Sequence, residues 1–158
     1  MPNYKGHLVG GAVTFVIVSS VIKYWNPTLL NSYQDIFTGL IFCALGSLFP
    51  DIDIKSMGQR IFYLLVFPLV VLAIATKRTS MLSILSVVAI VPVLVRHRGI
   101  IHRWWFVVFM PLIVPVLFAY NHSPFFVPSI ILYTFFVSGA LSHVFLDYGF
   151  KRMVRRYR

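Results

Sequence analysis

The sequence contains few charged residues for its length, and very few of them are acidic. Charged residues make up 11% of the 158 residues, against about 25% in typical soluble domains, and only four residues are acidic. A water-soluble domain of this size exposes too much surface to be covered by so few charges. Hydrophobic residues make up 59% of the chain. The composition therefore argues against a soluble protein and predicts an integral membrane protein.

Cysteine is also scarce, because the only one is Cys43, within an apolar run. A single cysteine excludes an intrachain disulfide, and we interpret Cys43 as a small buried hydrophobic residue. No cleavage site made of small residues follows the first apolar stretch, so we do not expect a cleaved signal peptide.

Six apolar runs separated by short polar segments predict an all-α fold, an integral membrane helical bundle with about six membrane-inserted helices. Residues 1–150 are expected to form a single transmembrane domain, followed by a basic tail over residues 151–158. The third and fourth runs are shorter than the ~20 residues that span a bilayer, so they either span with snorkelling flanks or form a shallow hairpin. The runs are Leu8–Trp25, Ile36–Phe49, Ile61–Thr76, Met81–Val95, Trp104–Tyr120 and Phe125–Phe150.

The basic residues predict the orientation of this bundle. The net charge of +10 could indicate a nucleic-acid partner, but the basic residues lie between the apolar runs, which the positive-inside rule explains better. With six crossings, both termini and the loops after the second and fourth runs share one face. That face carries eleven of the fourteen Lys and Arg residues. We therefore expect a multi-pass inner-membrane protein with both termini in the cytoplasm.

The same count of crossings places most of the histidines and aspartates on the predicted cytoplasmic face. His122 and Asp35 alone fall on the opposite face. The topology was predicted from the apolar runs and from Lys and Arg, without using His or Asp. The gathering of histidines and aspartates on one face is therefore partly independent support for a shared site. The residues gathered on the cytoplasmic face are His7, Asp51, Asp53, His97, His102, His143 and Asp147.

Two spacings among these residues are typical of metal ligands. His143 and Asp147 are four apart in a helical run, so both side chains lie on one helix face. Asp51 and Asp53 are two apart, and in an extended segment they would point the same way and repel each other without a cation between them. The alternatives are a hydrogen-bonded His–Asp pair at a helix end, and two carboxylates that end a helix and pair with Lys55.

His97 and His102 flank Gly99, which permits a sharp bend that could turn both imidazoles inward. The alternative is an ordinary basic loop. Taken together, four histidines and three aspartates offer more ligands than one tetrahedral zinc accepts, which indicates two or more divalent ions. We expect Zn²⁺, with Mn²⁺ or Mg²⁺ as alternatives.

The motifs that contain these residues are similar to those of the LexA-regulated inner-membrane family of metal-dependent hydrolases. The matching stretches are His7 to Gly10, Gly46–Asp53, His97–His102 and Ser138–Asp147. That family is considered distantly similar to zinc-dependent phospholipase C and P1-type nucleases, so the resemblance implies phosphoester hydrolysis. The chain departs from the family pattern at Ile54, where a His is common, and at Ile101 and Arg103, near which a Ser or Thr is common.

These observations predict a hydrolase of phosphoesters, such as a phospholipid or a lipid-linked phosphate, at the cytoplasmic membrane face. Arg98 would clamp a phosphate bidentately, with Arg103 as a second candidate. One of Asp51, Asp53 and Asp147 would hold or deprotonate the attacking water rather than only bind metal. Membrane lipids are the expected partners. The tail Lys151–Arg158 either binds anionic headgroups or acts only as a topology signal.

Three other functions fit parts of the pattern. A structural metal would staple the helix ends and leave no open coordination position. A metal transporter would carry its ligands near the middle of the bilayer. A lipid phosphatase with a histidine nucleophile would share the His143–Asp147 spacing, but its companion Pro-Ser-Gly-His element is absent.

Overall fold

The computed structural model describes residues 4–52, 57–77 and 101–155, and in this part of the chain the fold is all-α, as predicted. The predicted bounds of the fifth run are confirmed, whereas α1 begins four residues earlier than the first run and therefore includes His7. The fourth predicted run, Met81–Val95, lies outside the described residues. The helices are α1 (Tyr4–Trp25), α2 (Tyr33–Leu48), α3 (Met57–Ala75), α5 (Trp104–Tyr120) and α6 (Phe126–Arg155), with short 3-10 helices η1 (Pro27–Leu30) and η2 (Phe49–Asp51).

The start of α2 is specified by a capping box. The Ser32 hydroxyl accepts a hydrogen bond from the Asp35 backbone N–H, and the Asp35 carboxylate accepts one from the Ser32 backbone N–H. This reciprocal pair satisfies backbone donors that have no partner inside the helix. At its other end α2 passes into η2, where Pro50 and Asp51 form a single tight turn.

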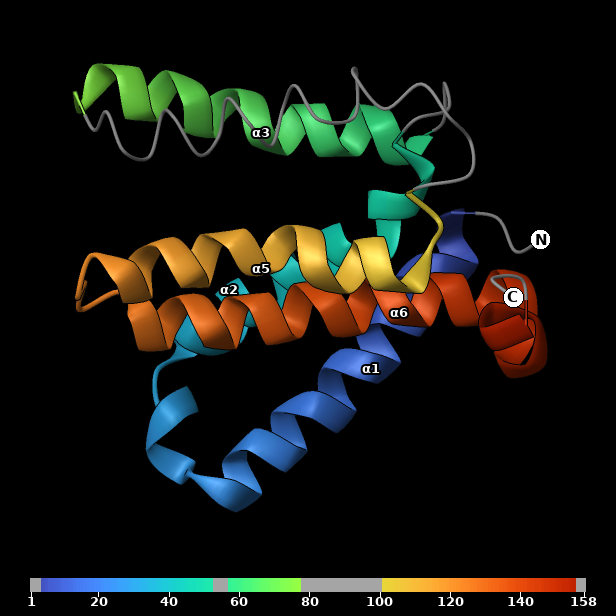
Figure 1. Cartoon of the computed structure of the whole chain (residues 1–158). Helices are drawn as coiled ribbons and strands as arrows, with labels where there is room; N and C mark the ends of the chain where they lie inside the picture. The colour runs from blue at the N-terminus through green and yellow to red at the C-terminus, as the bar shows by residue number, and fades with distance from the viewer. Residues whose placement is uncertain (1–3, 53–56, 78–100, 156–158) are drawn as a thin grey trace.

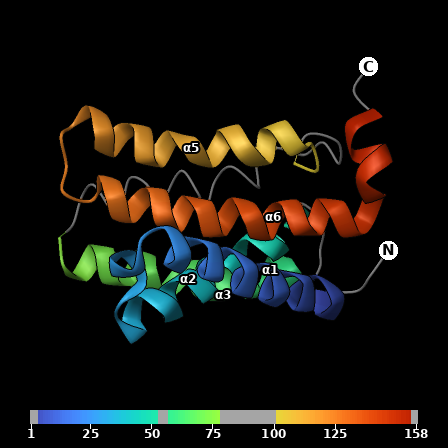
Figure 2. The ribbon, with the colours of Figure 1, turned by 90° about the horizontal axis from the view of Figure 1, so that it is seen from below.

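The helices lie roughly along a common direction: α6 lies between α5 and α2, α1 crosses α2 and α6 obliquely, and α3 is in a separate layer (Figures 1 and 2). The contact between α2 and α6 is the most extensive in the described chain. It depends on two glycines, because a Cβ on Gly46 would overlap the Phe136 carbonyl and one on Gly139 would overlap the Cys43 carbonyl. Small residues at such a crossing let two helix backbones touch.

Four chain segments end or begin at the same end of this bundle. The start of α1, the end of α2, the start of α5 and the far end of α6 all lie at the end where the termini are marked, on the right in Figure 1. The turn between α5 and α6 and the η1 segment lie at the opposite end. Residues that are distant in sequence therefore meet at one end of the bundle.

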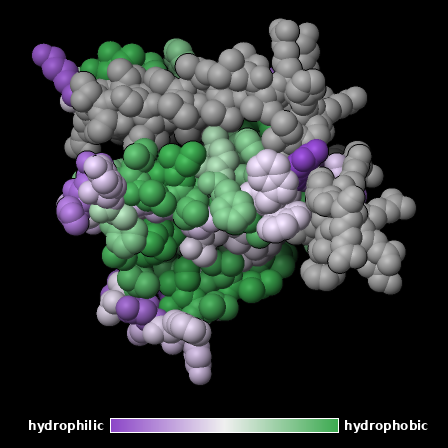
Figure 3. Space-filling view, viewed as in Figure 1, coloured by the Kyte–Doolittle hydropathy of each residue, from purple (hydrophilic) through white to green (hydrophobic). Residues whose placement is uncertain are grey.

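Two of the described helices are long and apolar enough to cross a membrane, namely α1 and the Phe126–Gly149 part of α6, while α5 is apolar but shorter. The side of the bundle seen in Figure 3 is mainly hydrophobic over these helices, and hydrophilic residues gather toward its ends. Large apolar side chains of α1 and α5 are exposed, which is the pattern expected of a lipid-facing surface. Examples are Val9, Val13, Ile17, Phe109 and Ile113.

The last helix is not one straight element. Gly149 interrupts α6 with φ 65° and ψ 161°, and the chain then resumes a helix as far as Arg155 in a very different direction (Figures 1 and 2). The sequence predicted a single apolar run that continues to Phe150. The structure instead bends the chain steeply at Gly149.

Candidate metal centre

His143 lies at the centre of the candidate site, in the second half of α6, and is fully buried. Its Nδ1 is 2.7 Å from the backbone carbonyl oxygen of Ser47 at the end of α2. A carbonyl oxygen only accepts hydrogen bonds, so Nδ1 must carry the proton. In the neutral ring Nε2 is therefore a bare lone pair, which is the form that binds metal.

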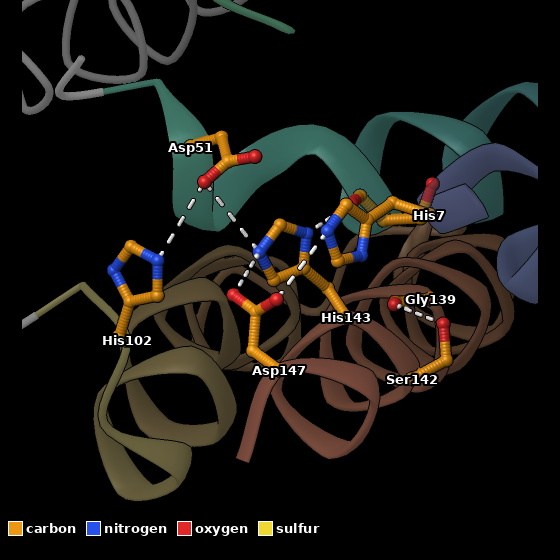
Figure 4. Close-up of polar contacts among 8 residues, drawn as sticks. His7, Asp51, His102, Gly139, Ser142, His143 and Asp147 are labelled. Carbon is orange, nitrogen blue, oxygen red and sulfur yellow. Dashed lines mark hydrogen bonds and ion pairs between the residues drawn. The ribbon is translucent and has the colours of Figure 1, made fainter. Parts of the chain in front are cut away.

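The lone pair of His143 faces carboxylate oxygens rather than donors (Figure 4). Its Nε2 is 3.3 Å from Oδ2 of Asp147 and 3.6 Å from Oδ1 of Asp51. Among the described residues, neither His143 Nε2 nor Asp147 Oδ1 has a hydrogen-bond partner, and both are buried. Converging buried acceptors without a donor are unstable unless a proton or a cation lies between them.

His102 adds a second imidazole to this group. Its Nε2 is 3.7 Å from Oδ1 of Asp51. One ligand atom from each of Asp51, His102, His143 and Asp147 can be chosen so that all four lie within 4.8 Å of one another. Two imidazoles and two carboxylates are a donor set that suits zinc and other divalent ions. The four residues fit a metal ion, and below we call them the His/Asp cluster.

His7 lies against the cluster without belonging to this set of four. Its ring stacks on that of His143, with centroids 3.7 Å apart. Its Nε2 is 3.5 Å from Oδ1 of Asp147, whereas the other oxygen of Asp147 faces His143. The Asp147 carboxylate therefore lies between two imidazoles, one at each oxygen.

Local structure explains how each ligand candidate reaches the site. His143 and Asp147 are four residues apart on α6, so they share a helix face as the sequence predicted. Asp51 lies in the tight turn of η2. The prediction of an extended conformation at this residue is therefore wrong. The turn is held because Phe49 and Ile52 on either side of Asp51 are buried in a hydrophobic cluster.

Ile101 gives a structural reason for one departure from the family pattern. Its side chain is buried in that same hydrophobic cluster, where it joins Phe49, Ile52 and Phe62. Burial of an aliphatic side chain of this size contributes about 2 kcal/mol. Ile101 therefore fixes the segment before α5, and with it the neighbouring His102, against the turn that carries Asp51.

The cluster opens on the side of Asp51. The Asp51 side chain is 25% exposed, whereas the side chains of Asp147 and His143 are 4% and 0% exposed. Burial would raise the pKa of Asp51, but the hydrogen bond with His102 and the attraction of the neighbouring imidazoles in their protonated form outweigh it, so this pKa is lowered. Asp51 is thus an ionised carboxylate at the accessible edge of the site.

Three predicted site residues lie outside the described part of the chain, and two residues that were not predicted in the site lie far from it. Asp53, His97 and Arg98 lie outside the described residues, and their roles stay predictions. His122 and Asp35 were predicted on the opposite face, and they lie in the α5–α6 turn and in the first turn of α2, away from the cluster.

The sequence did not identify every residue that shapes the site. The Ser47 carbonyl sets the tautomer of His143, and the close α2–α6 crossing at Gly46 and Gly139 brings this carbonyl within reach. The signal for this crossing in the sequence is the series of small residues Gly39, Ala44, Gly46 and Ser47 in the second apolar run. Tyr148 is a second such residue, since its ring lies edge-on to that of His102, with centroids 6.2 Å apart.

The fold and the cluster together define a helical membrane protein with a buried His/Asp site of the kind that can hold a metal ion. A family model described as "YdjM inner membrane protein" matches residues 1–155, and the chain belongs to this family. The predicted location in the inner membrane is thereby confirmed. No curated protein and no solved structure matches the chain significantly. LexA regulation and the similarity to phospholipase C stay predictions.

Proposed function

We propose that the protein is a membrane-embedded metal-dependent hydrolase of phosphoesters, acting on a phospholipid or a lipid-linked phosphate at the cytoplasmic face of the inner membrane. One observation carries the proposal: the buried lone pair of His143 faces oxygens of Asp51 and Asp147 and has no donor among the described residues. A divalent ion, Zn²⁺ first and Mn²⁺ or Mg²⁺ as alternatives, would supply an acidified water and polarise a phosphoryl oxygen when bound.

The residues of the cluster have distinct tasks in this proposal. His143, His102 and Asp147 would hold the ion, since their side chains are buried and converge. Asp51 is at the open edge, where it can accept a proton from a water that approaches from outside. The second oxygen of Asp147 faces His7, so these two residues would help to hold a second ion if one were bound.

Phosphate recognition is assigned to Arg98, with Asp53 and His97 as further ligands or proton acceptors. These three residues are proposed from their sequence motifs alone. A guanidinium binds two phosphate oxygens at once, which a lysine ammonium does not do. Arg98 is therefore the residue whose replacement should weaken substrate binding rather than metal binding.

The proposed topology has six membrane crossings and both termini in the cytoplasm. The described helices support a face that these segments share. The start of α1, the end of α2, the start of α5 and the far end of α6 all lie at the cluster. The predicted cytoplasmic face also carries eleven of the fourteen basic residues. The cluster lies at helix ends, whereas a transporter would bind its ion near the bilayer midplane.

A structural metal is the second candidate function. It is favoured by the fact that the cluster and His7 connect α1, η2, the segment before α5, and α6. An ion that staples these segments would stabilise the fold without catalysis. The exposed edge at Asp51 favours the hydrolase, because a purely structural site is usually closed.

The test is a screen of phosphomonoesters and phosphodiesters, including phospholipids, with purified protein in the presence of Zn²⁺, Mn²⁺ or Mg²⁺ and in the presence of chelator. We expect turnover that chelator abolishes and that Asp51→Asn reduces by at least about a hundredfold, the scale of losing a general base. The matched control is His122→Asn, which removes a histidine far from the cluster, and Asn tolerates its positive φ of 48°. If metal-loaded protein turns over no phosphoester, the hydrolase proposal is contradicted and the structural metal is the remaining candidate function.

A further inference from the structure

Three neighbouring helices are short in relation to the thickness of a membrane. α5 has 17 residues between Arg103 and Asn121, so at 1.5 Å per residue it is about 25 Å long. α2 has 16 residues and is about 24 Å long, and Asp51 lies in the turn after its end. On α6, His143 is 17 residues, or about 26 Å, from the start of the helix at Phe126. The hydrocarbon core of a typical bilayer is about 30 Å thick.

The three helices share one bilayer. The Phe126–Gly149 part of α6 has the length and composition of a membrane span. α2 and α5 both pack along α6, which lies between them (Figures 1 and 2). If α6 crosses the bilayer, α2 and α5 therefore cross it alongside. The exposed apolar side chains of α5, such as Phe109 and Ile113, then face the lipid.

Neither end of these helices can withdraw into the hydrocarbon. At the end away from the cluster, Asp35, Asn121 and His122 are exposed, and their side chains are too short to reach the headgroups as Lys or Arg can. At the cluster, the carboxylate of Asp51 is 25% exposed and faces His102, and a carboxylate within hydrocarbon is costly. Tilting the bundle would only shorten its span. The remaining accommodation is a thinner bilayer around the bundle.

Aromatic residues at both ends of the short helices are consistent with this level of the membrane. Tyr33 at the start of α2 and Tyr120 at the end of α5 are 92% and 83% exposed. Trp104 and Trp105 begin α5 at the cluster end, and both are exposed. Tyrosine and tryptophan are enriched where the hydrocarbon meets the headgroups on both sides of a membrane. α5 therefore has residues suited to the two interfaces only about 25 Å apart.

We propose that the bilayer is thinner by about 5 Å around α2 and α5, and that this brings the phosphates of the leaflet at the cluster end to the level of Asp51. The partner is the surrounding phospholipid. Since Asp51 is the accessible edge of the metal centre, a lipid phosphate can meet the centre while its acyl chains stay in the bilayer. The choice of a membrane lipid as the substrate rests on the proposed function. The thinning itself follows from helix lengths and stands without hydrolysis.

The first experiment varies the thickness of the bilayer around the full-length protein. The protein is reconstituted into vesicles of dimyristoleoyl-, dioleoyl- or dierucoylphosphatidylcholine, which differ in chain length and not in headgroup, and its thermal unfolding is measured. We expect the melting temperature to be highest in the thinnest bilayer and several degrees lower in the thickest, because the mismatch grows with chain length. A melting temperature that is equal in the three lipids, or highest in dierucoylphosphatidylcholine, would overturn the proposal.

The second experiment measures the depth of both ends of α5 in dioleoylphosphatidylcholine. Trp25→Phe leaves the native tryptophans Trp104 and Trp105 as reporters at the cluster end. Replacing all three tryptophans by Phe and adding Tyr120→Trp places one reporter at the other end. Ile113→Trp in the same tryptophan-free background is the matched control, because Ile113 is exposed near the middle of α5.

Quenching by brominated phosphatidylcholines then gives the depth of each reporter. We expect the reporters at both ends to be quenched most by bromine near the lipid carbonyls, and Ile113→Trp most by bromine near the chain ends. Stronger quenching by the deep bromine at either end would show that this end lies inside the hydrocarbon, and would overturn the proposal. Neither experiment measures turnover, so a bilayer that is not thinned is distinguishable from a protein that is not a hydrolase.

Discussion

Both ends of the helical bundle contain His and Asp, but these residues are exposed at one end and buried at the other. At the end away from the termini, Asp35 is exposed and its carboxylate accepts hydrogen bonds from the backbone and hydroxyl of Ser32. His122 is exposed in a turn at that end. At the other end, Asp147 and His143 are buried and face each other without a donor among the described residues.

The comparison shows that residue type alone does not identify a metal site. Asp35 completes a helix cap, and its charge is both solvated and hydrogen-bonded. Asp147 is 4% exposed and has a buried oxygen without a donor in the described chain, an arrangement that costs free energy unless a cation is bound. The missing donor, rather than the presence of His and Asp, distinguishes the two ends.

The largest effect is expected from Gly139→Ala, which breaks the packing that builds the site. The new Cβ would overlap the backbone carbonyl of Cys43, which cannot move as a side chain can, so we expect a loss of about 3 kcal/mol in unfolding free energy. Gly10→Ala is the matched control, since its Cβ meets only the end of the Leu146 side chain, at 2.6 Å. Unfolding in detergent measures both, and equal stability of the two variants would contradict the proposed crossing.

Metal removal should have the next largest effect. A ligand that binds only the folded protein at one hundred times its dissociation constant stabilises it by about 2.7 kcal/mol. We therefore expect chelator to lower the melting temperature of the wild-type protein and to have little effect on His143→Ala. A melting temperature of the wild type that chelator does not change would argue against any bound ion.

Asp147→Asn is expected to act in opposite directions on the metal-free and metal-bound protein. At pH 8 histidine is ordinarily neutral, and the new amide can donate a hydrogen bond to the lone pair of His143. This should stabilise the metal-free protein by about 1 kcal/mol and abolish the stabilisation by metal. Thermal unfolding with and without Zn²⁺ measures both effects. A metal-free variant less stable than the metal-free wild type would show that the acceptors already have a donor.

Asp35→Ala should give the smallest effect and complete the comparison. Loss of a carboxylate from the first turn of α2 is expected to cost about 0.5 kcal/mol and to leave the metal content unchanged. Metal analysis and thermal unfolding of the same preparation measure both quantities. A loss of metal in this variant would mean that the two ends of the bundle are coupled.

Much of this fold could be predicted because apolar runs and charge are local properties of the sequence. The bounds of α5 follow from its apolar composition, and the gathering of His7, Asp51, His102 and His143 at one end follows from counting crossings. The start of α1 was missed because Tyr4, Lys5 and Gly6 are not part of an apolar run, although they are helical.

The features that could not be predicted depend on how distant segments meet. The hydrogen bond from His143 to the Ser47 carbonyl spans 96 positions in sequence and exists only because two glycines let α2 and α6 touch. The conformation of Gly149 could not be predicted either, since the sequence contains other glycines that remain inside helices. Periodicity describes one helix at a time and does not specify these contacts.

The central claim is that the His/Asp cluster binds a metal ion, and the most direct test is elemental analysis of protein purified without added chelator. We predict at least one equivalent of a divalent metal in the wild type and in His122→Asn, and its loss from the double variant Asp51→Asn with His143→Ala. Full retention of metal in that double variant, or a wild-type protein without metal even after incubation with Zn²⁺, would contradict the claim.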